Sequence, residues 1–503
     1  MPRLPPYRHE LRHVVKPLVD AFTADRDRSP YKRFDSILDE IETGVREDRW
    51  DADTIEDQYC EIVSKSRDSP QEVTDAEIAT AIAAATVGTH TDILGVFYQL
   101  SGRTSDHFDQ FFTPPNVAEG AATMAAGARE NFNRPAIAAE NVSGQSSFDV
   151  FADGGAAEDD EDAVSTGGPS PDPHDETVVF DPACGSGRLL LAGARVTAGT
   201  VALGWDAAYT AARMTAITLA LTRTPGWVVQ GDSTTLDANT VWRIAPSTNG
   251  VLEEFSVSGE TRFPTEYADD PEIKPAAPEL TESVSSIPEV VEEIQRVLSR
   301  GVDLTVANPP FGNADIKRGS GSASRTRFDL ARKDLDDRGS GLKSSVGFEW
   351  LMFELAADVT LPTGAVCFIV PMSALSAPSE KQQRRWLRET MYLTASVELP
   401  SETFAPETKT RTGMLTAIPR TEEESGISLD YEVYMAIVEQ MGHGNRATGI
   451  SMTTDDGDLT VDVSELPREY TAHRWLGKSV VTVPDDDVPA VIAKYLDFNS
   501  TAA

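Results

Sequence analysis

The feature that most constrains the fold is an alternation that begins at residue 177, where short apolar runs are followed by segments of helical periodicity. The runs have the length of buried strands, and the segments between them repeat apolar residues at helical spacing. Alternation of this kind specifies a doubly wound, mostly parallel sheet with right-handed crossovers. The last run is expected to form a hairpin at the sheet edge. We therefore expect an α/β fold with seven strands, at Val178–Asp181, Val201–Asp206, Trp227–Gly231, Val302–Ala307, Ala365–Val370, Leu393–Leu399 and Thr412–Ile418.

The rest of the chain divides by periodicity and composition. Segments such as Ala76–Ala85 place apolar residues at i, i+3 and i+4, which predicts a helical N-terminal domain. Residues 141–176 contain ten acidic residues and no Lys or Arg, which predicts a flexible insertion. We expect a helical domain at 1–105, a connecting region at 106–140 and the acidic insertion at 141–176. The α/β domain follows at 177–425, and a mixed segment ends the division at 426–503. Within the α/β domain, residues 235–300 are expected to form a second acidic insertion that contains one helix.

The charge balance narrows the class of protein. The chain has 81 Asp and Glu against 44 Lys and Arg, which gives a formal net charge of −37. An acidic disordered protein, a nucleic-acid mimic and an enzyme adapted to very high salt are the competing explanations. The strand-like apolar runs exclude the disordered protein. Acidic residues spread through all segments favour a hydrated, halophilic surface over a mimic.

Compartment and metal content follow from the cysteines and the N-terminus. The three cysteines are too few and too scattered for a disulfide framework or a zinc site, so we expect no metal. The N-terminus has no apolar core of signal-peptide length, and no apolar stretch reaches the length of a membrane span. A soluble, cytoplasmic protein without a membrane partner is expected.

A glycine turn follows the first expected strand, in Asp181-Pro-Ala-Cys-Gly-Ser-Gly187. Gly185 and Gly187 let the backbone approach a ligand closely, and the N-terminus of the next helix favours an anionic group. Asp206, at the end of the second strand, is placed to bind ribose hydroxyls, and Asp232 after the third can accept from an adenine amino group. Each feature alone also fits a tight turn or a helix cap. Their order predicts a nucleotide-type cofactor site.

Asn308-Pro-Pro-Phe311 is a polar tip on the fourth expected strand. An exocyclic amine on a base ring is a poor nucleophile because its lone pair is delocalised. The Asn308 side-chain oxygen and the Pro309 carbonyl can accept from both N–H groups of such an amine, and the prolines fix the backbone that aims them. Phe311 offers a face on which a base drawn out of a duplex can stack. A proline turn with local Asx bonds is the alternative for this segment alone.

A third motif, Gln110-Phe-Phe-Thr-Pro114, precedes the glycine turn. Together the three resemble motifs X, I and IV of the γ-type amino-methyltransferases, which use S-adenosylmethionine (SAM) to methylate DNA bases. Over about residues 35–445 the chain resembles the modification subunit of type I restriction–modification systems and its stand-alone N6-adenine relatives. Further stretches that carry the resemblance are Asp92–Gln99, Glu398–Phe404, Thr410–Leu415 and Tyr434–Glu439. The insertions at 141–176 and 235–300 depart from the family's usual spacing.

The resemblance implies a seven-stranded SAM-dependent methyltransferase sheet and methylation of adenine N6 in a specific DNA sequence. It implies catalytic roles for Asn308, Pro309, Pro310 and Phe311. The cofactor-binding residues that it implies are Gln110, Phe112, Thr113, Pro114, Asp181, Ala183, Gly185, Ser186, Gly187, Asp206, Asp232 and Asn308.

One segment of this acidic chain is basic. Residues 317–343 hold eight Lys and Arg against four Asp, are rich in Gly and Ser, and begin soon after Phe311. A flexible basic loop beside the catalytic tip would lie where the phosphates flanking a flipped adenine in double-stranded DNA pass. A solvated loop without a ligand is the alternative. The expected DNA-binding residues are Lys317, Arg318, Arg325, Arg327, Arg332 and Lys333.

Several functions remain open at this stage. The same acceptors suit the N4 amine of cytosine, and related tips serve methylation of RNA amines or of glutamine in proteins. A non-catalytic DNA-binding or assembly subunit is a further alternative, which the intact Asp181, Asn308 and Phe311 argue against. No recognition domain is evident after residue 430. We therefore expect either a separate specificity subunit, docked on residues 8–100 and 425–503, or recognition of a very short site.

Overall fold

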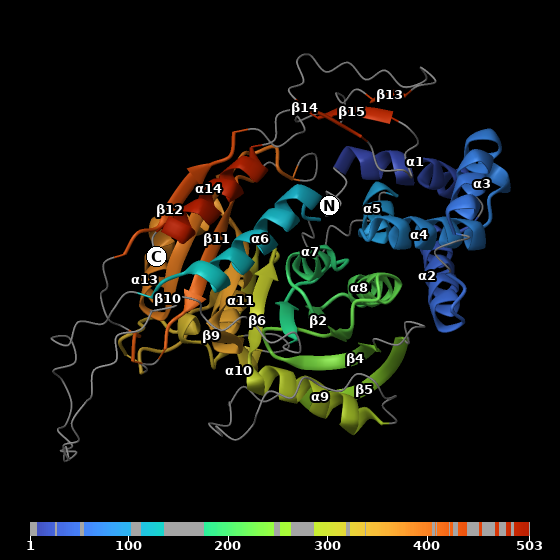
Figure 1. Ribbon diagram of the computed structural model, residues 1–503. Helices are drawn as coiled ribbons and strands as arrows, with labels where there is room; N and C mark the ends of the chain where they lie inside the picture. Colours follow the sequence, from blue (N-terminus) through green and yellow to red (C-terminus); the bar gives the residue numbers. More distant parts are fainter. Residues whose placement is uncertain are drawn as a thin grey trace, which may run out of the picture.

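The computed structural model has a ten-stranded sheet with helices on both faces and a helical unit at one end (Figure 1). It describes residues 8–25, 28–50, 55–101, 112–134, 176–245, 252–262, 286–317, 322–337, 339–404, 408, 410–421, 423–425, 431–439, 452–454, 468–471, 479–483 and 487–501. The acidic segment 141–176, except for its last residue, lies outside the described residues. The expected site residues Gln110 and Arg318 also lie outside them.

The centre of the sheet is parallel, and its edges are antiparallel. The strand order is β12-β10-β11-β9-β6-β1-β2-β3-β4-β5. All pairs from β9 to β3 are parallel, as the alternation of runs and helices predicts. These five strands are β9 (Thr360–Pro371), β6 (Val302–Ala307), β1 (Thr177–Asp181), β2 (Thr200–Asp206) and β3 (Gly226–Gln230).

The expectation of seven strands is corrected to ten. Two of the added strands, β4 (Asp237–Ile244) and β5 (Leu252–Arg262), come from the segment expected to be an insertion with one helix, and they extend the sheet beyond β3 in antiparallel pairing. The third is β12 (Tyr434–Ile437), which pairs in parallel with β10 (Met391–Leu399) at the opposite edge. The pairing of these strands depends on a partner that is remote in sequence or on a hairpin turn. The periodicity of a single run does not show with which strand that run will pair.

β11 (Thr412–Pro419) pairs in antiparallel fashion with the preceding strand β10, as expected for a hairpin, but it does not lie at the sheet edge. It lies inside the sheet, with β9 as its second antiparallel neighbour. Its continuous burial fits that position, because a strand covered on both faces needs apolar or small side chains throughout.

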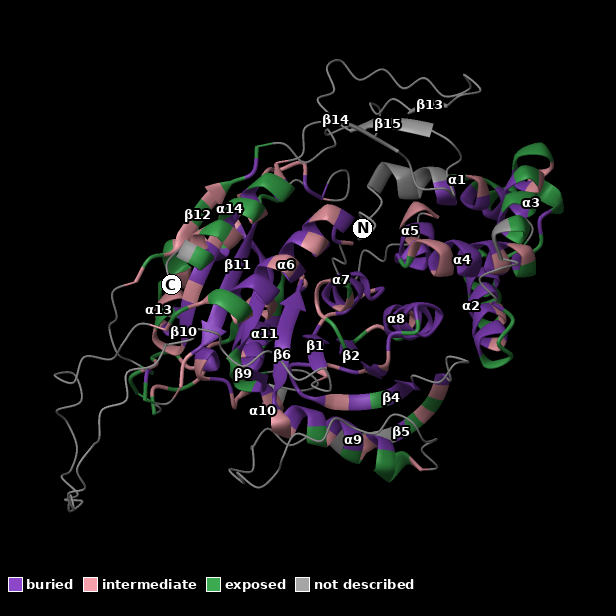
Figure 2. Cartoon of the chain, in the orientation of Figure 1, coloured by how far each residue is buried: buried purple, intermediate pink, exposed green. Residues whose placement is uncertain are grey.

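Successive side chains of each central strand enter two different cores. Val179 of β1 packs with the helices of one face, whereas Val178 and Phe180 pack with those of the other. Figure 2 shows these strands buried along most of their length. The first face carries α6 (Pro115–Asn131), α7 (Arg188–Val196), α8 (Tyr209–Leu221) and α14 (Val488–Thr501), and the second carries α9 (Ile287–Arg300), α11 (Phe348–Val359) and α13 (Lys381–Thr390).

The N-terminal helices form a unit that packs on α8. Its central helix, α4, is apolar on most of its surface and starts with a capping box between Thr74 and Glu77. Arg213 of α8 binds Glu42 of α2 at 2.8 Å, which ties the unit to the sheet domain. No helix in the described ranges combines the length and the apolar character needed to cross a bilayer. The helices of the unit are α1 (Arg8–Ala24), α2 (Pro30–Arg46), α3 (Ile55–Asp68), α4 (Asp75–Thr89) and α5 (Ile93–Leu100).

Candidate active site

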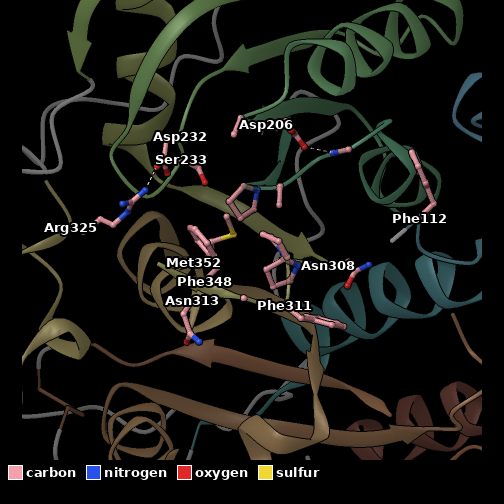
Figure 3. A pocket seen from close by; sticks show the side chains of 17 residues that line it. Phe112, Asp206, Asp232, Ser233, Asn308, Phe311, Asn313, Arg325, Phe348 and Met352 are labelled. Carbon is pink, nitrogen blue, oxygen red and sulfur yellow. Dashed lines mark hydrogen bonds and ion pairs between the residues drawn. The ribbon is translucent and has the colours of Figure 1, made fainter. Parts of the chain in front are cut away.

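The polar strand ends meet at one edge of the parallel sheet. In the order β6-β1-β2-β3, the strands lead to Asn308, the glycine turn, Asp206 and Asp232, respectively. The carboxyl ends of parallel strands share one edge, which is where doubly wound sheets bind nucleotides. A cavity of about 490 Å³ opens there (Figure 3). It is lined by Phe112, Pro182, Ala183, Gly185, Asp206, Ala207, Asp232, Ser233, Asn308, Pro309, Pro310, Phe311, Gly312, Asn313, Arg325, Phe348 and Met352.

The glycine turn has the backbone that its sequence predicts. Gly185 has a φ of +57° and Gly187 a φ of +90°, a region that side chains with a Cβ rarely adopt. A Cβ at Gly185 would meet no protein atom within 4 Å, although this residue lines the cavity. A side chain at position 185 would therefore project into space that glycine leaves open for a ligand.

Backbone N–H groups hold the Asp206 carboxylate in place, and burial raises its pKa. Its Oδ2 accepts from the Gly185 N–H at 2.9 Å, and its Oδ1 from the Ala208 N–H at 2.8 Å. Burial raises the pKa of Asp206 to about 6, against the opposing effect of the two backbone hydrogen bonds. An ionised carboxylate has lone pairs beyond these two, so Asp206 can accept further hydrogen bonds from a diol.

Asp181 lies behind the glycine turn. Its Oδ1 accepts from the Ala183 N–H at 2.9 Å. Its Oδ2 is buried and has no hydrogen-bond partner among the described residues. Burial raises the pKa of Asp181 well above its usual range, and the negative charge of Asp206 adds to the rise. A buried oxygen in this state is stabilised by a donor from water or from a bound ligand.

Asp232 faces the cavity with both oxygens already bonded. Its Oδ1 accepts from the Thr234 N–H at 2.9 Å and from the Thr234 hydroxyl at 2.6 Å. Its Oδ2 forms an ion pair with Arg325, and the Arg325 Nε donates to the Thr234 hydroxyl at 2.9 Å. The orientation of the Asp232 carboxylate is thus fixed before any ligand binds.

Arg325 occupies a place that the sequence did not predict. It was expected in a flexible loop that contacts phosphates, yet only 8% of its surface is exposed and it lines the cavity. A guanidinium that can reach a partly buried carboxylate is stabilised there, because the pair forms in a medium of low dielectric constant. The Arg325–Asp232 contact spans 93 positions, so spacing gave no signal of it.

The Asn308-Pro-Pro-Phe311 tip follows β6 directly, and all four residues line the cavity. Figure 3 shows Asn308 and Phe311 on the opposite wall from Asp232 and Arg325. Phe311 is only partly buried and packs on the core with its remaining surface. The cavity therefore joins an amide, two prolines and an accessible ring to the acids at the ends of β2 and β3.

Six of the twelve expected cofactor residues line the cavity, namely Phe112, Ala183, Gly185, Asp206, Asp232 and Asn308. Asp181, Ser186 and Gly187 belong to the turn but do not line the cavity, and Thr113 and Pro114 are buried beside it. Phe348 and Met352, from the first turns of α11, also line the cavity and were not expected there. They lie in a mostly apolar and largely buried helix, whose sequence does not distinguish a cavity residue from a core residue.

In the basic segment, the described residues 322–337 and 339–343 are folded rather than a flexible loop. Phe328, Leu330 and Ala331 are buried, and the Glu354 carboxylate accepts from the N–H groups of Asp329 and Leu330 at 2.5 and 3.0 Å. Burial raises the pKa of Glu354 to about 8. Of the expected DNA-binding residues, Lys317 and Lys333 are exposed, and Arg327 and Arg332 are partly exposed.

No family model and no curated protein sequence matches this chain. Three solved structures are similar in their arrangement. A protein from Listeria monocytogenes assigned as a class I SAM-dependent methyltransferase has 11% identity and a TM-score of 0.43, over 86% of this chain and 92% of that one. The type I restriction–modification methyltransferase subunit from Streptococcus thermophilus has 14% identity and a TM-score of 0.42, over 94% and 75%. A type I modification subunit from Vibrio vulnificus has 14% identity and a TM-score of 0.35, over 71% and 52%.

Proposed function

We propose that this chain is a SAM-dependent DNA methyltransferase that methylates the N6 amine of adenine, as part of or related to a restriction–modification system. The observation that carries the proposal is that Asn308-Pro-Pro-Phe311 and the acids Asp206 and Asp232 line one cavity. A nucleotide-type cofactor site and a set of acceptors for an amine thus share one space.

The residues on the cavity fit SAM. Asp206 would accept from the ribose hydroxyls, and Gly185 leaves room for the cofactor backbone beside it. Asp232, fixed by Thr234 and Arg325, would accept from the adenine amino group. SAM, when bound, supplies an electrophilic methyl group.

The tip after β6 would prepare the amine. The Asn308 oxygen and the Pro309 carbonyl would accept from the two N–H groups, which favours a tetrahedral nitrogen with a localised lone pair. Pro309 and Pro310 restrict the backbone, so these acceptors need little reorganisation. Phe311 would stack on the flipped base and hold its amine beside the acceptors.

The large negative net charge of the chain opposes DNA binding. A chain with a formal charge of −37 repels phosphates unless cations are concentrated where DNA docks. Lys317 and Lys333 are exposed cations of the segment that follows the tip, and Arg327 and Arg332 reach solvent in part. We propose that these four, together with Arg318, contact the phosphates. Arg325 instead belongs to the cavity wall.

The function can be tested with DNA and SAM carrying a labelled methyl group. After the reaction, DNA is digested and its nucleosides are separated by mass spectrometry. We expect labelled N6-methyladenine. Labelled N4-methylcytosine would support the cytosine alternative, and label in RNA or protein but not in DNA would overturn the proposal.

A matched pair of variants links the product to the site. Asn308→Ala should lower turnover by about 100-fold or more while the dissociation constant for SAM stays nearly constant, as expected when an acceptor in the transition state is lost. Asn239→Ala, in an exposed position of β4 outside the cavity, is the control and should leave both values unchanged. Near-normal turnover of a folded Asn308→Ala protein would refute the role of Asn308.

The need for a partner is a separate question with a simple readout. If the purified chain methylates a defined DNA sequence by itself, it is a self-sufficient enzyme. If it binds SAM and methylates DNA only with a co-expressed neighbouring protein, a specificity subunit is required. We favour the second outcome, in which the partner reads base edges and this chain contacts phosphates.

A further inference from the structure

A buried ionic cluster joins the helical unit to the glycine turn. Asp92, which is fully buried, accepts from Arg188 Nη2 at 3.0 Å and from the Ser186 hydroxyl through its Oδ2. Its Oδ1 caps α5 by accepting from the Gly95 N–H at 2.7 Å. A single carboxylate thus holds the start of α5 against the two residues on either side of Gly187.

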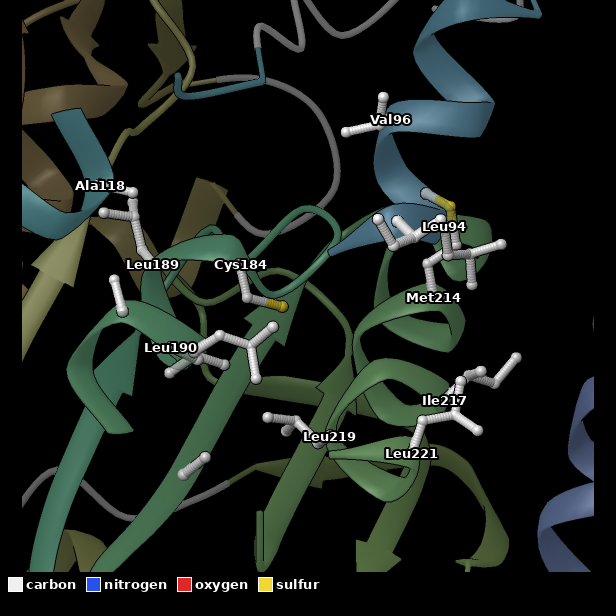
Figure 4. Packing of buried hydrophobic residues seen from close by; sticks show 14 of the residues in the cluster. Leu94, Val96, Ala118, Cys184, Leu189, Leu190, Met214, Ile217, Leu219 and Leu221 are labelled. Carbon is white, nitrogen blue, oxygen red and sulfur yellow. The ribbon is translucent and has the colours of Figure 1, made fainter. Parts of the chain in front are cut away.

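The close approach in this cluster requires glycine at position 95. A Cβ there would lie 2.3 Å from both the Asp92 Oδ2 and the Ser186 Oγ, a distance that cannot be accommodated without displacing the cluster. Apolar packing surrounds it: Leu94 of α5 lies beside Met214 of α8 (Figure 4), and Val96 and the turn residue Cys184 belong to the same core. The contact between the helical unit and the turn is therefore tight and specific.

Arg188 connects the same cluster to the strip that precedes α6. Its Nη1 donates to the Thr113 carbonyl at 2.6 Å, and its guanidinium carbon lies 5.9 Å from the centre of the Phe112 ring. Tyr98 of α5 also contacts Phe112, with the two ring centres 6.2 Å apart. Arg188 is 8% exposed, and its partner Asp92 is not exposed at all.

The strip forms one end of the cavity. Phe112 lines the cavity, and Figure 3 shows it on the far side of the glycine turn from Asp232. If Asp232 binds the adenine and Asp206 the ribose, the space between the turn and Phe112 receives the part of the cofactor beyond the ribose, which is its amino-acid end. Arg188 does not line the cavity and would act only through the strip.

We propose that Arg188 is a positioning residue that holds Phe112 and Thr113 over the amino-acid end of the cofactor, and that Asp92 makes the helical unit part of this site. The inference rests on the proposed function. Arg188 suits the role because its planar fork reaches the Asp92 carboxylate and the Thr113 carbonyl at the same time. A lysine offers one ammonium group and cannot reproduce both contacts with the same geometry.

The test compares two ligands that share the adenine and the ribose. SAM carries the amino-acid chain on a positively charged sulfonium, whereas 5′-methylthioadenosine is a neutral thioether without that chain. Calorimetry on Arg188→Lys should show SAM binding weakened by about tenfold or more, as expected for the loss of a charged hydrogen bond, with methylthioadenosine binding changed by less than about twofold. Asp206→Asn should weaken both ligands.

Two controls separate positioning from folding. Arg33→Lys alters another buried Arg–Asp pair of the helical unit, in which Arg33 Nε binds Asp75 at 2.8 Å away from the cavity. It should lower the melting temperature and leave both affinities unchanged. If Arg188→Lys does not fold, the double variant Asp92→Asn/Arg188→Gln removes both charges together and takes its place.

The outcomes are distinguishable. Equal weakening of SAM and methylthioadenosine in the Arg188 variant, or no weakening of either, would overturn the positioning role. Unchanged SAM binding in a folded Asp206→Asn protein would instead overturn the proposed cofactor site itself, whatever the Arg188 variant does.

Discussion

Replacing Asp206 by asparagine is expected to stabilise the ligand-free protein while it weakens SAM binding. In the folded protein burial raises the pKa of Asp206 from 3.8 to about 6. The folded state therefore holds the proton more tightly than the unfolded state, and ionisation lowers stability as pH rises from about 4 to 6. The shift is about two pKa units, so the penalty at neutral pH is roughly 3 kcal/mol.

Asparagine removes that penalty and keeps one acceptor oxygen. Of the two backbone N–H groups that bind the carboxylate, from Gly185 and Ala208, one loses its partner, which costs about 1 kcal/mol. A net stabilisation of about 1–2 kcal/mol is expected at neutral pH without SAM. Hydrogen bonds from the ribose then end on a neutral amide instead of a charge, which weakens binding by about 1–2 kcal/mol, or roughly 5–30-fold.

Thermal unfolding without ligand and calorimetry with SAM measure the two effects on the same preparations. Asp303→Asn is the matched control, because Asp303 is buried near the start of β6, where it accepts from the Val178 N–H at 2.8 Å and pairs with Arg129. This control should be less stable than the wild type and bind SAM normally. The reasoning fails if Asp206→Asn is folded and binds SAM within about twofold of the wild type.

Three other predictions concern pH, salt and DNA. SAM affinity should fall as pH is lowered through about 6, where Asp206 takes up a proton, by at most about tenfold per pH unit, and titration calorimetry should find no such fall in Asp206→Asn. The free energy of unfolding should rise from dilute buffer to molar salt, because the Debye length shrinks from about 30 Å to about 3 Å and the acidic surface repels itself less; full stability in dilute buffer contradicts the halophilic interpretation. Lys317→Ala with Lys333→Ala should reduce the dependence of DNA affinity on salt by roughly two phosphate contacts, whereas Lys381→Ala on α13 should leave it unchanged; an unaltered salt dependence in the double variant excludes these lysines from the interface.

The sequence alone determined the parallel centre of the sheet and the polar residues that stand at its edge. Val302–Ala307 was placed within its observed bounds because a mostly apolar run between Gly301 and Asn308-Pro has the length and the flanking residues typical of a buried strand. Each acid or amide at a strand end follows directly from such a run, so its position at the shared edge needs no information beyond the order of strands. Whether a residue directly follows a strand is a local property, so it can be read from the sequence.

Tertiary structure decided which groups meet from a distance. Arg325 forms an ion pair with Asp232, and Arg188 binds both Asp92 and Thr113. The residues of these contacts are separated by 75 to 96 positions in the sequence. Neither pairing has a periodicity or a spacing, because an ion pair depends on where the two backbones pass in space and on how little water remains between them. For the same reason β11 entered the sheet between β9 and β10: the run itself specifies a strand, but only hydrogen bonds to partners elsewhere in the chain choose its neighbours.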